Sequence, residues 1–306
     1  MIRHLLTGEE FDHDAMMRLF DLTAKIKRER FSPNAIKPLA GKSIGVIFAK
    51  SSTRTRVSFE VGIHELGGHA VILDMGKTQM GRGETIHDTA KVLSRYLQGI
   101  VIRTYKQSDV EGLAEHGTAS VINALTDDYH PCQALGDLFT ILEKKGSLDG
   151  VKMAYLGDGA SNMSNSLALV SKIAGIEFAI AAPEEFRPAD SILNYANGSG
   201  KISWTKDPKE ALDGADFIYT DVWVSMGFEE EAKERMRILQ PYQLNGKQLA
   251  LAKKDVSVMH CLPAHRGEEI TDEVMDSPNS IVFDEAENRM HTIKAVIAAT
   301  LGAKFE

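Results

Sequence analysis

The chain alternates between short, almost wholly apolar runs and longer segments in which apolar residues recur every three or four positions. The short runs lack the period-two alternation of a half-exposed strand, so they are typical of strands covered on both faces. Strands that alternate with amphipathic helices in this way indicate parallel sheets joined by right-handed crossovers. Eight runs fit this description: 43–49, 70–75, 99–104, 120–125, 151–158, 176–183, 216–223 and 256–263.

Two helical patterns indicate how these strands are divided. A helix predicted over about 131–145 follows the fourth strand and bridges two groups of four. The pattern over about 289–302 predicts a final helix, which we expect to pack back on the first group. The sequence therefore predicts an α/β fold with two doubly wound parallel-sheet domains, 1–149 and 150–288, joined by helices. Ligands of such domains bind at the carboxyl ends of the strands, so we expect an active site in the interdomain cleft.

Composition narrows the classes of function. The net charge of −8 opposes general binding to nucleic acid or to an anionic membrane, so any anion site must be local. No window approaches the apolar length of a membrane span, and the N-terminus lacks a signal-peptide core. The two cysteines, Cys132 and Cys261, lie far apart and indicate reduced thiols. We therefore expect a soluble cytoplasmic protein that acts on small molecules.

A local anion site is predicted where the first strand ends. Residues 51–56 read SSTRTR and lie between that strand and an amphipathic helix. The first turn of a helix presents unpaired N–H groups and the positive end of the helix dipole. Hydroxyls add donors, and each guanidinium matches two phosphate oxygens. A simple helix cap with two solvated arginines is the alternative, but two arginines alternating with hydroxyls favour anion binding.

A nucleotide is a poor candidate for that anion. The GKS and GKT triplets at Gly41 and Gly76 resemble the end of a P-loop, but both lack the glycine required five residues earlier. The segment GDGASN resembles a dinucleotide fingerprint, yet Asn162 stands at the position of its third glycine. A nucleotide-dependent oxidoreductase therefore stays only as a fold-level alternative.

Further polar residues follow other predicted strands. Arg103 closes the third strand, and His130 with Gln133 follows the fourth; together they could polarise a carbonyl group beside a phosphate. Asp221 and Cys261 each end a strand of the second group, and a carboxylate beside a thiol indicates recognition of an amine. Taken singly, Arg103 is explained by a surface ion pair and His130 by a helix cap.

A metal site is not predicted. His130, Cys132, His260 and Cys261 are residue types that bind zinc, but they do not occur with the spacing of a known zinc motif.

Taken together, the motifs resemble one family from end to end. SSTRTR, QMGRGE, HPCQ, DVWVSMG, HCLPAHRGEE and FDEAENR occur in the order and at about the spacing of the carbamoyltransferases. SSTRTR and HPCQ are features of the whole aspartate/ornithine carbamoyltransferase superfamily, whereas DVWVSMG with HCLPAHRGEE is similar to its ornithine-using branch. The resemblance implies transfer of the carbamoyl group of carbamoyl phosphate to the δ-amine of L-ornithine. The products are L-citrulline and phosphate, and no cofactor is needed.

The resemblance also implies site residues. The positions matched to carbamoyl phosphate are Ser52, Thr53, Arg54, Thr55, Gln79, Arg103, His130, Gln133, Cys261, Leu262 and Arg289. The positions matched to ornithine are Asn162, Asp221, Ser225 and Met226. The catalytic positions are Arg54, Arg103, His130, Asp221 and Cys261. In this family the position of Gln79 reaches an active site across a subunit boundary. The resemblance also implies a homotrimer, or a higher assembly of trimers.

Other acceptors are disfavoured within the same family. Enzymes that use putrescine or an acylated ornithine have altered loops at DVWVSMG, and the short C-terminal tail lacks the extra helix seen in putrescine enzymes. An aspartate-specific relative would need basic groups where this chain has Asp221 and Cys261. A catalytically silent scaffold is disfavoured because no matched position is missing. The resemblance places the reaction in arginine metabolism.

Overall fold

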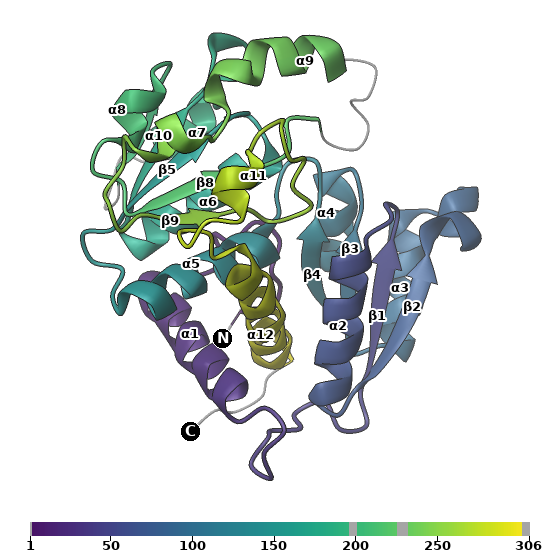
Figure 1. The fold of residues 1–306 in the computed structure, drawn as a ribbon. Helices are drawn as coiled ribbons and strands as arrows, with labels where there is room; N and C mark the ends of the chain where they lie inside the picture. The colour runs from purple at the N-terminus through teal and green to yellow at the C-terminus, as the bar shows by residue number, and fades with distance from the viewer. Residues whose placement is uncertain (1, 196–200, 225–231, 302–306) are drawn as a thin grey trace. The chain divides into compact units, whose positions relative to one another are not determined.

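The computed structural model describes residues 2–195, 201–224 and 232–301, which fold into two compact units (Figure 1). Unit 1 contains Met1–Phe139 and Asn288–Glu306, and unit 2 contains Thr140–Glu287. The described strands are β1 (Ser43–Phe48), β2 (His69–Asp74), β3 (Gly99–Arg103), β4 (Ser120–Leu125), β5 (Lys152–Leu156), β6 (Glu177–Ala181), β7 (Ile202–Thr205), β8 (Phe217–Thr220) and β9 (Ser257–Met259). The described α-helices are α1 (His13–Arg28), α2 (Thr53–Glu65), α3 (Ile86–Tyr96), α4 (Gln107–His116), α5 (Pro131–Lys145), α6 (Asn162–Ala174), α7 (Asp190–Tyr195), α8 (Pro208–Leu212), α9 (Ala232–Leu239), α10 (Gly246–Leu249), α11 (Asp272–Met275) and α12 (Val282–Thr300).

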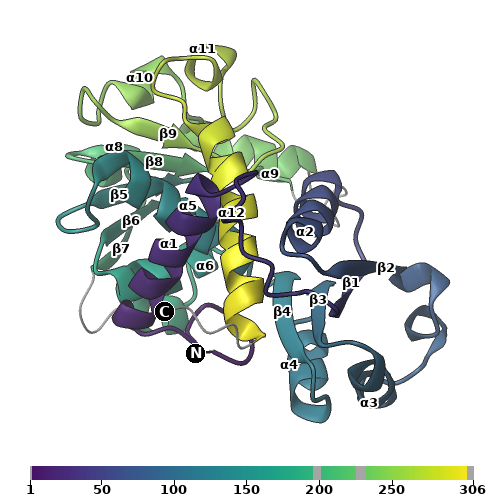
Figure 2. The same ribbon diagram turned by 90° about the horizontal axis from the view of Figure 1, so that it is seen from below.

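The sheet of unit 1 has the strand order β2-β1-β3-β4, and its described pairs are all parallel. Figure 2 shows α2 on one face of this sheet and α3 with α4 on the other. The inner strands β1 and β3 are buried along almost their whole length, whereas the edge strand β2 is only half-buried. The doubly wound parallel arrangement predicted from the apolar runs is therefore confirmed in this unit.

The last helix packs against α2 within unit 1. The ammonium group of Lys294 on α12 lies 2.7 Å from the carboxylate of Glu65 on α2, and the guanidinium of Arg30 lies 2.7 Å from the same carboxylate. The helix begins at Val282 rather than at 289, because its first turn is acidic and interrupts the apolar period on which the prediction relied. No described helix is long and apolar enough to cross a membrane.

The sheet of unit 2 has five described strands in the order β7-β6-β5-β8-β9, again all parallel. Four of them match predicted runs, so the prediction of only four strands in this half was wrong. The missed strand, β7, is a short edge strand with a polar residue at every second position, and most of its side chains are partly exposed. Continuous apolar runs mark the other strands, the edge strand β2 included, but Ser203 and Thr205 break such a run in β7.

Both faces of this second sheet are buried. Successive side chains of a strand point to opposite faces, so Ala154 and Leu156 join an apolar cluster that includes residues of α8 and α11. On the other face Tyr155 stacks on Tyr219, with ring centroids 6.0 Å apart. Burial on both faces explains why these strands lack an alternating pattern in the sequence.

Candidate active site

In unit 1 the predicted carbamoyl phosphate residues follow strands that end side by side. In the parallel register Phe48 of β1 pairs with Arg103 of β3, and Arg103 pairs with Leu125 of β4. The backbone continues this pairing past the strands, because Ala49 N donates to the carbonyl of Arg103 at 2.8 Å. The segments that lead into α2 and α5 therefore start from the same edge of the sheet. That edge carries the SSTRTR segment, Arg103 and the loop that ends at His130.

The SSTRTR segment forms the first turn of α2. Ser52 is the N-cap, and its hydroxyl oxygen accepts a hydrogen bond of 3.3 Å from Thr55 N. Thr53 and Arg54 are exposed, whereas Thr55 is buried. The helix has no acidic residue in its first turn, so the positive end of its dipole is not offset there. The helix-cap alternative is correct for Ser52, but it leaves the exposed donors of this turn available to an anion.

The two arginines of this segment differ in their surroundings. The Nε atom of Arg56 lies 3.3 Å from Glu60 Oε1, one helical turn further along α2. Arg54 has no hydrogen-bond or ion-pair partner within the described part of the chain. A cation without a partner at a helix N-terminus is unfavourable because it adds to the positive end of the dipole. An anion bound beside Arg54 would remove this conflict.

His130 is buried in unit 1, where the charges of two arginines act on it. Its side chain is buried, and Arg103 and Arg289 are buried nearby. Burial, and then the charges of Arg103 and Arg289, hold the pKa of His130 well below its usual value. The imidazole is therefore neutral near neutral pH and offers one N–H donor to a carbonyl oxygen.

This depressed pKa predicts a pH dependence of stability. The unfolded chain binds a proton at His130 near pH 6.5, whereas the folded protein binds one only at lower pH. Between these values the unfolded state holds more protons, so the free energy of unfolding falls as the pH falls below 6.5. We expect the free energy of unfolding to fall less steeply with pH in His130→Gln than in the wild type, by up to about 1.4 kcal/mol per pH unit. Urea unfolding at a series of pH values measures this slope. His13→Gln, which replaces an exposed histidine, is the control; an unaltered pH dependence in His130→Gln would contradict the assignment.

The amide of Gln133 links α5 to α12. Its Nε2 donates to Asp137 Oδ1 at 2.8 Å, and its Oε1 accepts from Arg289 Nη1 at 3.0 Å. The two helices meet closely at Gly136, because a Cβ atom there would lie 3.0 Å from the Cα atom of Arg289. Both Gln133 and Arg289 were predicted as site residues, whereas Asp137 was missed because nothing in the motif separates it from an ordinary polar helix residue.

Gln79 lies apart from this group. It precedes a short 3₁₀ turn, Met80–Arg82, beyond the edge strand β2, and its side chain is exposed. Within the described residues no hydrogen bond joins its side chain to Arg54, Arg103 or His130.

Cys132, in contrast, is a core residue. Its thiol is buried and donates to the carbonyl oxygen of Asn123, with a sulfur–oxygen distance of 3.3 Å. Burial raises the pKa of the Cys132 thiol to about 12. The side chain is therefore a neutral thiol that packs between α5 and β4, as the prediction of a reduced cysteine requires.

In unit 2 Asp221 and Cys261 are in direct contact. They follow the neighbouring strands β8 and β9, whose register pairs Tyr219 with Met259. Cys261 Sγ donates to Asp221 Oδ1 at 3.0 Å, and Val222 N donates to the same oxygen at 2.8 Å. A thiol that donates its hydrogen is not a thiolate, so this geometry disfavours Cys261 as a covalent nucleophile. The pair instead presents a largely buried carboxylate suited to an amine.

A buried histidine fixes the backbone beside Cys261. Leu262 has a left-handed φ of 59° and precedes a cis peptide bond to Pro263. Leu262 N donates to His260 Nδ1 at 2.9 Å, so the ring proton is assigned to Nε2, which lies 3.1 Å from Glu269 Oε1. His260 and Glu269 are fully buried. His260 was considered only as a zinc ligand in the sequence; its role here is to hold the main chain.

The other predicted ornithine residues follow β5 and β8. Asn162 is the first residue of α6, and its neighbour Ser161 caps the helix and lies 3.0 Å from the hydroxyl of Tyr155. Burial, and then the charge of Asp221, raises the pKa of Tyr155 well above its usual value, so this phenol stays neutral near Asp221. Ser225 and Met226 lie outside the described residues.

One buried ion pair that the sequence did not indicate joins helix α9 to the loop after β5. Arg235 on α9 pairs with Asp158, which follows β5, and its Nε donates to the carbonyl of Trp223 at 2.8 Å. Burial outweighs the effect of Arg235 and raises the pKa of the Asp158 carboxyl. Asp158 and Arg235 are far apart in the sequence, so no local pattern could have indicated that they form an ion pair.

Asp221, His260 and Cys261 also place ligand atoms within 4.8 Å of one another. Both ring nitrogens of His260 are engaged in hydrogen bonds, and the thiol of Cys261 is bound to Asp221. A metal ion would have to replace these bonds, so the arrangement fits hydrogen bonding better than coordination.

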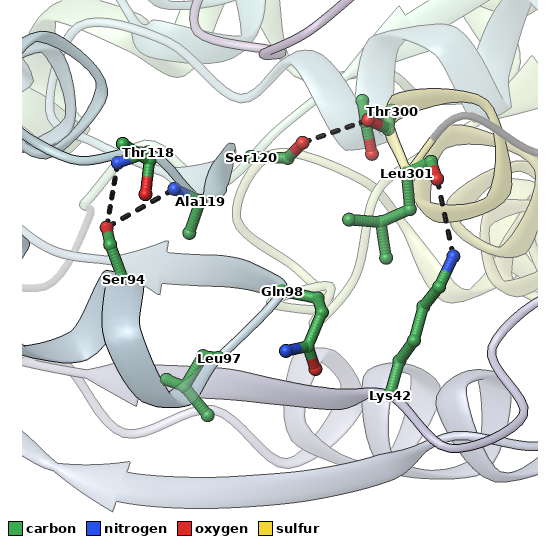
Figure 3. A pocket seen from close by; sticks show the side chains of 9 residues that line it. All are labelled: Lys42, Ser94, Leu97, Gln98, Thr118, Ala119, Ser120, Thr300 and Leu301. Atoms are coloured by element: carbon green, nitrogen blue, oxygen red, sulfur yellow. Dashed lines mark hydrogen bonds between the residues drawn. The ribbon is translucent and has the colours of Figure 1, made fainter.

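A pocket of about 490 Å³ occupies the opposite, amino edge of the unit 1 sheet (Figure 3). Lys42 donates a hydrogen bond of 3.3 Å to the carbonyl of Leu301, and Ser120 donates one of 2.9 Å to the carbonyl of Thr300. These two bonds hold the end of α12 at this edge. The pocket contains none of the predicted site residues. The candidate chemistry therefore lies at the carboxyl edge, as expected for a parallel sheet.

The two parts of the chain match the two domains of one protein family. Residues 3–143 match the carbamoyl-P binding domain of aspartate/ornithine carbamoyltransferase, and residues 149–300 match its Asp/Orn binding domain. The chain is 48% identical to an ornithine carbamoyltransferase of Geobacter metallireducens, with 98% of this chain and 100% of that protein covered. It is 51% identical to that of Methanosarcina mazei, with 97% and 98% covered.

Solved structures of ornithine carbamoyltransferases are also similar to this chain. The ornithine carbamoyltransferase of Pyrococcus furiosus superposes with a TM-score of 0.94 at 46% identity, over 99% of this chain and 98% of that one. That of Thermus thermophilus superposes with a TM-score of 0.90 at 41% identity, over 98% and 99%.

Proposed function

The chain belongs to the aspartate/ornithine carbamoyltransferase family, and we propose that it transfers the carbamoyl group of carbamoyl phosphate to the δ-amine of L-ornithine. The products are L-citrulline and phosphate. The structural observation that carries the choice of acceptor is the contact between Asp221 and Cys261, because a carboxylate held beside a thiol suits an amine and would repel the second carboxylate of aspartate.

We assign carbamoyl phosphate to the domain of residues 1–149 and ornithine to that of residues 150–288. The phosphate is held by hydroxyls, backbone N–H groups and one guanidinium at the start of α2, which supply the donors an anion requires. The residues in this role are Ser52, Thr53, Arg54 and Thr55. The carbamoyl end is held by Arg103, His130, Gln133 and Arg289, with Gln79 reaching in from a neighbouring subunit.

Ornithine is held through its charged ends and its reacting amine. Asp221 accepts from the α-amino group, since it is a largely buried carboxylate at the carboxyl edge of the sheet. Asn162, Ser225 and Met226 complete the site for the α-amino and α-carboxylate groups. The thiol of Cys261 and the main-chain carbonyls of Cys261 and Leu262, which His260 holds in place, orient the δ-amine.

Transfer proceeds by attack of the neutral δ-amine on the carbamoyl carbon; the C–O bond to phosphate breaks, and the amine nitrogen gives up one proton, which the leaving phosphate accepts. Negative charge develops on the carbonyl oxygen and on the leaving phosphate, and Arg54, Arg103 and the neutral N–H of His130 stabilise it. Holding both substrates in reacting geometry supplies up to about 7–11 kcal/mol in favourable cases. These steps use side chains and main-chain groups of the protein.

We also propose a homotrimer, or a higher assembly of trimers, as the family resemblance implies; Gln79, which is exposed beyond β2, is then available to a neighbouring subunit. We place the enzyme in the cytoplasm, because neither of its cysteines forms a disulfide bond, and in arginine biosynthesis, because its product is citrulline.

The test is a citrulline assay with carbamoyl phosphate and three acceptors offered in parallel: ornithine, putrescine and aspartate. We expect ornithine to be used at least about 100-fold more efficiently than the other two, the discrimination available to a site that pairs both charged ends of its substrate. A preference for putrescine or aspartate would contradict the acceptor assignment. Binding of NAD(H) without carbamoyl transfer would favour the oxidoreductase alternative.

A further inference from the structure

We propose that Asp137 is a positioning residue that turns the amide oxygen of Gln133 toward the carbamoyl group, and that it thereby helps the enzyme distinguish carbamoyl phosphate from acyl phosphates. Asp137 is fully buried on α5, one helical turn beyond Gln133. It acts through Gln133 and not on the substrate. The inference rests on the proposed role of Gln133 at the carbamoyl end.

The orientation of the amide follows from its two neighbours. A carboxylate only accepts hydrogen bonds and a guanidinium only donates them, so the nitrogen of Gln133 must face Asp137 and its oxygen must face Arg289. A flipped amide would set oxygen against oxygen at Asp137 and N–H against N–H at Arg289. Gln133 and Arg289 are 1% and 6% exposed, so water cannot relieve either conflict.

The direction of the amide relative to the sheet also matters. α5 follows β4 at the carboxyl edge of the unit 1 sheet, and Asp137 lies one turn further along the helix than Gln133, so it draws the amide nitrogen toward the C-terminal end of α5. The oxygen faces Arg289, whose charge also acts on His130. The acceptor atom of Gln133 is therefore turned toward the residues proposed to bind the carbamoyl end. Because Asp137 lies four residues along the same helix, one of the two hydrogen bonds that set this orientation is made within α5 itself.

An amide oxygen at the carbamoyl end of the site accepts a hydrogen bond from the amino group of the substrate. A carbonyl oxygen can accept a second hydrogen bond, and the –NH₂ of carbamoyl phosphate is a donor. The methyl group of acetyl phosphate is not a donor and would leave a buried acceptor without that bond. An amide nitrogen in the same place would not make this distinction.

The test compares two classes of substitution at Asp137. Asp137→Leu removes the acceptor at similar volume, and Asp137→Asn keeps a carbonyl acceptor. For each variant the KM of carbamoyl phosphate and the Ki of acetyl phosphate as a competitive inhibitor are measured, together with the KM of ornithine. We expect the ratio of Ki to KM to fall about tenfold in Asp137→Leu, the value of one hydrogen bond, and to stay within about twofold in Asp137→Asn. The KM of ornithine should be unchanged. Asp137→Ala replaces Asp137→Leu if the latter does not fold.

Two further variants separate the possible failures. Asp216→Asn alters another buried aspartate, which pairs with Lys145 and Lys253, and should lower the thermal midpoint without changing the ratio. Gln133→Leu should lower the ratio as far as Asp137→Leu does.

An unchanged ratio in Gln133→Leu would overturn the role proposed for Gln133. The role of Asp137 alone would be overturned by a different result. In that case the ratio falls in Gln133→Leu but keeps its wild-type value in folded Asp137→Leu or Asp137→Ala. An equal change in Asp216→Asn would show that the ratio reports general destabilisation.

Discussion

Replacing Arg54 with alanine is expected to lower kcat/KM for carbamoyl phosphate by at least about 30-fold. The guanidinium stands in the first turn of α2, where it has no protein partner among the described residues and adds to the positive end of the helix dipole. A charge-assisted bond to the leaving phosphate, which strengthens as charge develops, is worth at least about 2 kcal/mol. That energy corresponds to the stated factor at 25 °C. Steady-state kinetics at saturating ornithine measure it directly.

The neighbouring arginine is a matched control. Arg56 is exposed two residues along the same helix and pairs with Glu60. Arg56→Ala removes the same charge from the same turn and should keep kcat/KM within about twofold, because surface ion pairs contribute little. Equal losses in the two variants would mean that general electrostatic attraction, and not a bond to phosphate, is at work. Unchanged kinetics in Arg54→Ala would remove the phosphate assignment altogether.

Replacing Asp221 with asparagine is expected to reduce kcat/KM for ornithine by about 10-fold to 100-fold. Asparagine keeps the shape of the side chain and an acceptor for Cys261 and Val222, but it removes the charge that would pair with the α-ammonium group. Hydrogen bonds to charged groups are worth about 1.5–3 kcal/mol. The KM of carbamoyl phosphate should change by less than about threefold, because that substrate is assigned to the other domain.

The decisive measurement is the pair of KM values in one variant. A similar loss for both substrates would move Asp221 out of the amino-acid site. Asp213→Asn, at an exposed position of the same unit, controls for the change in net charge and should leave both values unaltered.

Much of the fold could be read from the sequence. Strands buried on both faces must be apolar at every position, and this requirement is visible as continuous runs. The missed strand β7 shows the limit of that reasoning, because Ile202–Thr205 lies at a sheet edge and is free to alternate. The early start of α12 has a similar cause, since a first turn favours acidic residues over apolar ones.

Candidate site residues were found where a motif follows a strand. SSTRTR and HPCQ stand at strand ends, and parallel strands end at one edge of a sheet, so their nearness within unit 1 follows from topology. The different surroundings of Arg54 and Arg56 did not follow, because residues two apart on a helix face different directions and only packing shows which one finds a partner.

The sequence by itself determined the α/β class, the parallel sheets and the family, since these depend on the order of apolar runs and motifs along the chain. Only the tertiary structure decided which polar groups meet. Asp221 and Cys261 are joined across two strands, and Arg289 reaches Gln133 although the two are 156 positions apart in the sequence. The protonation of His130 was decided in the same way, first by its burial and then by the charges of two arginines that folding brings close. Hydrogen bonds and charge interactions act over a few ångströms of space, and separation along the chain carries no information about that distance.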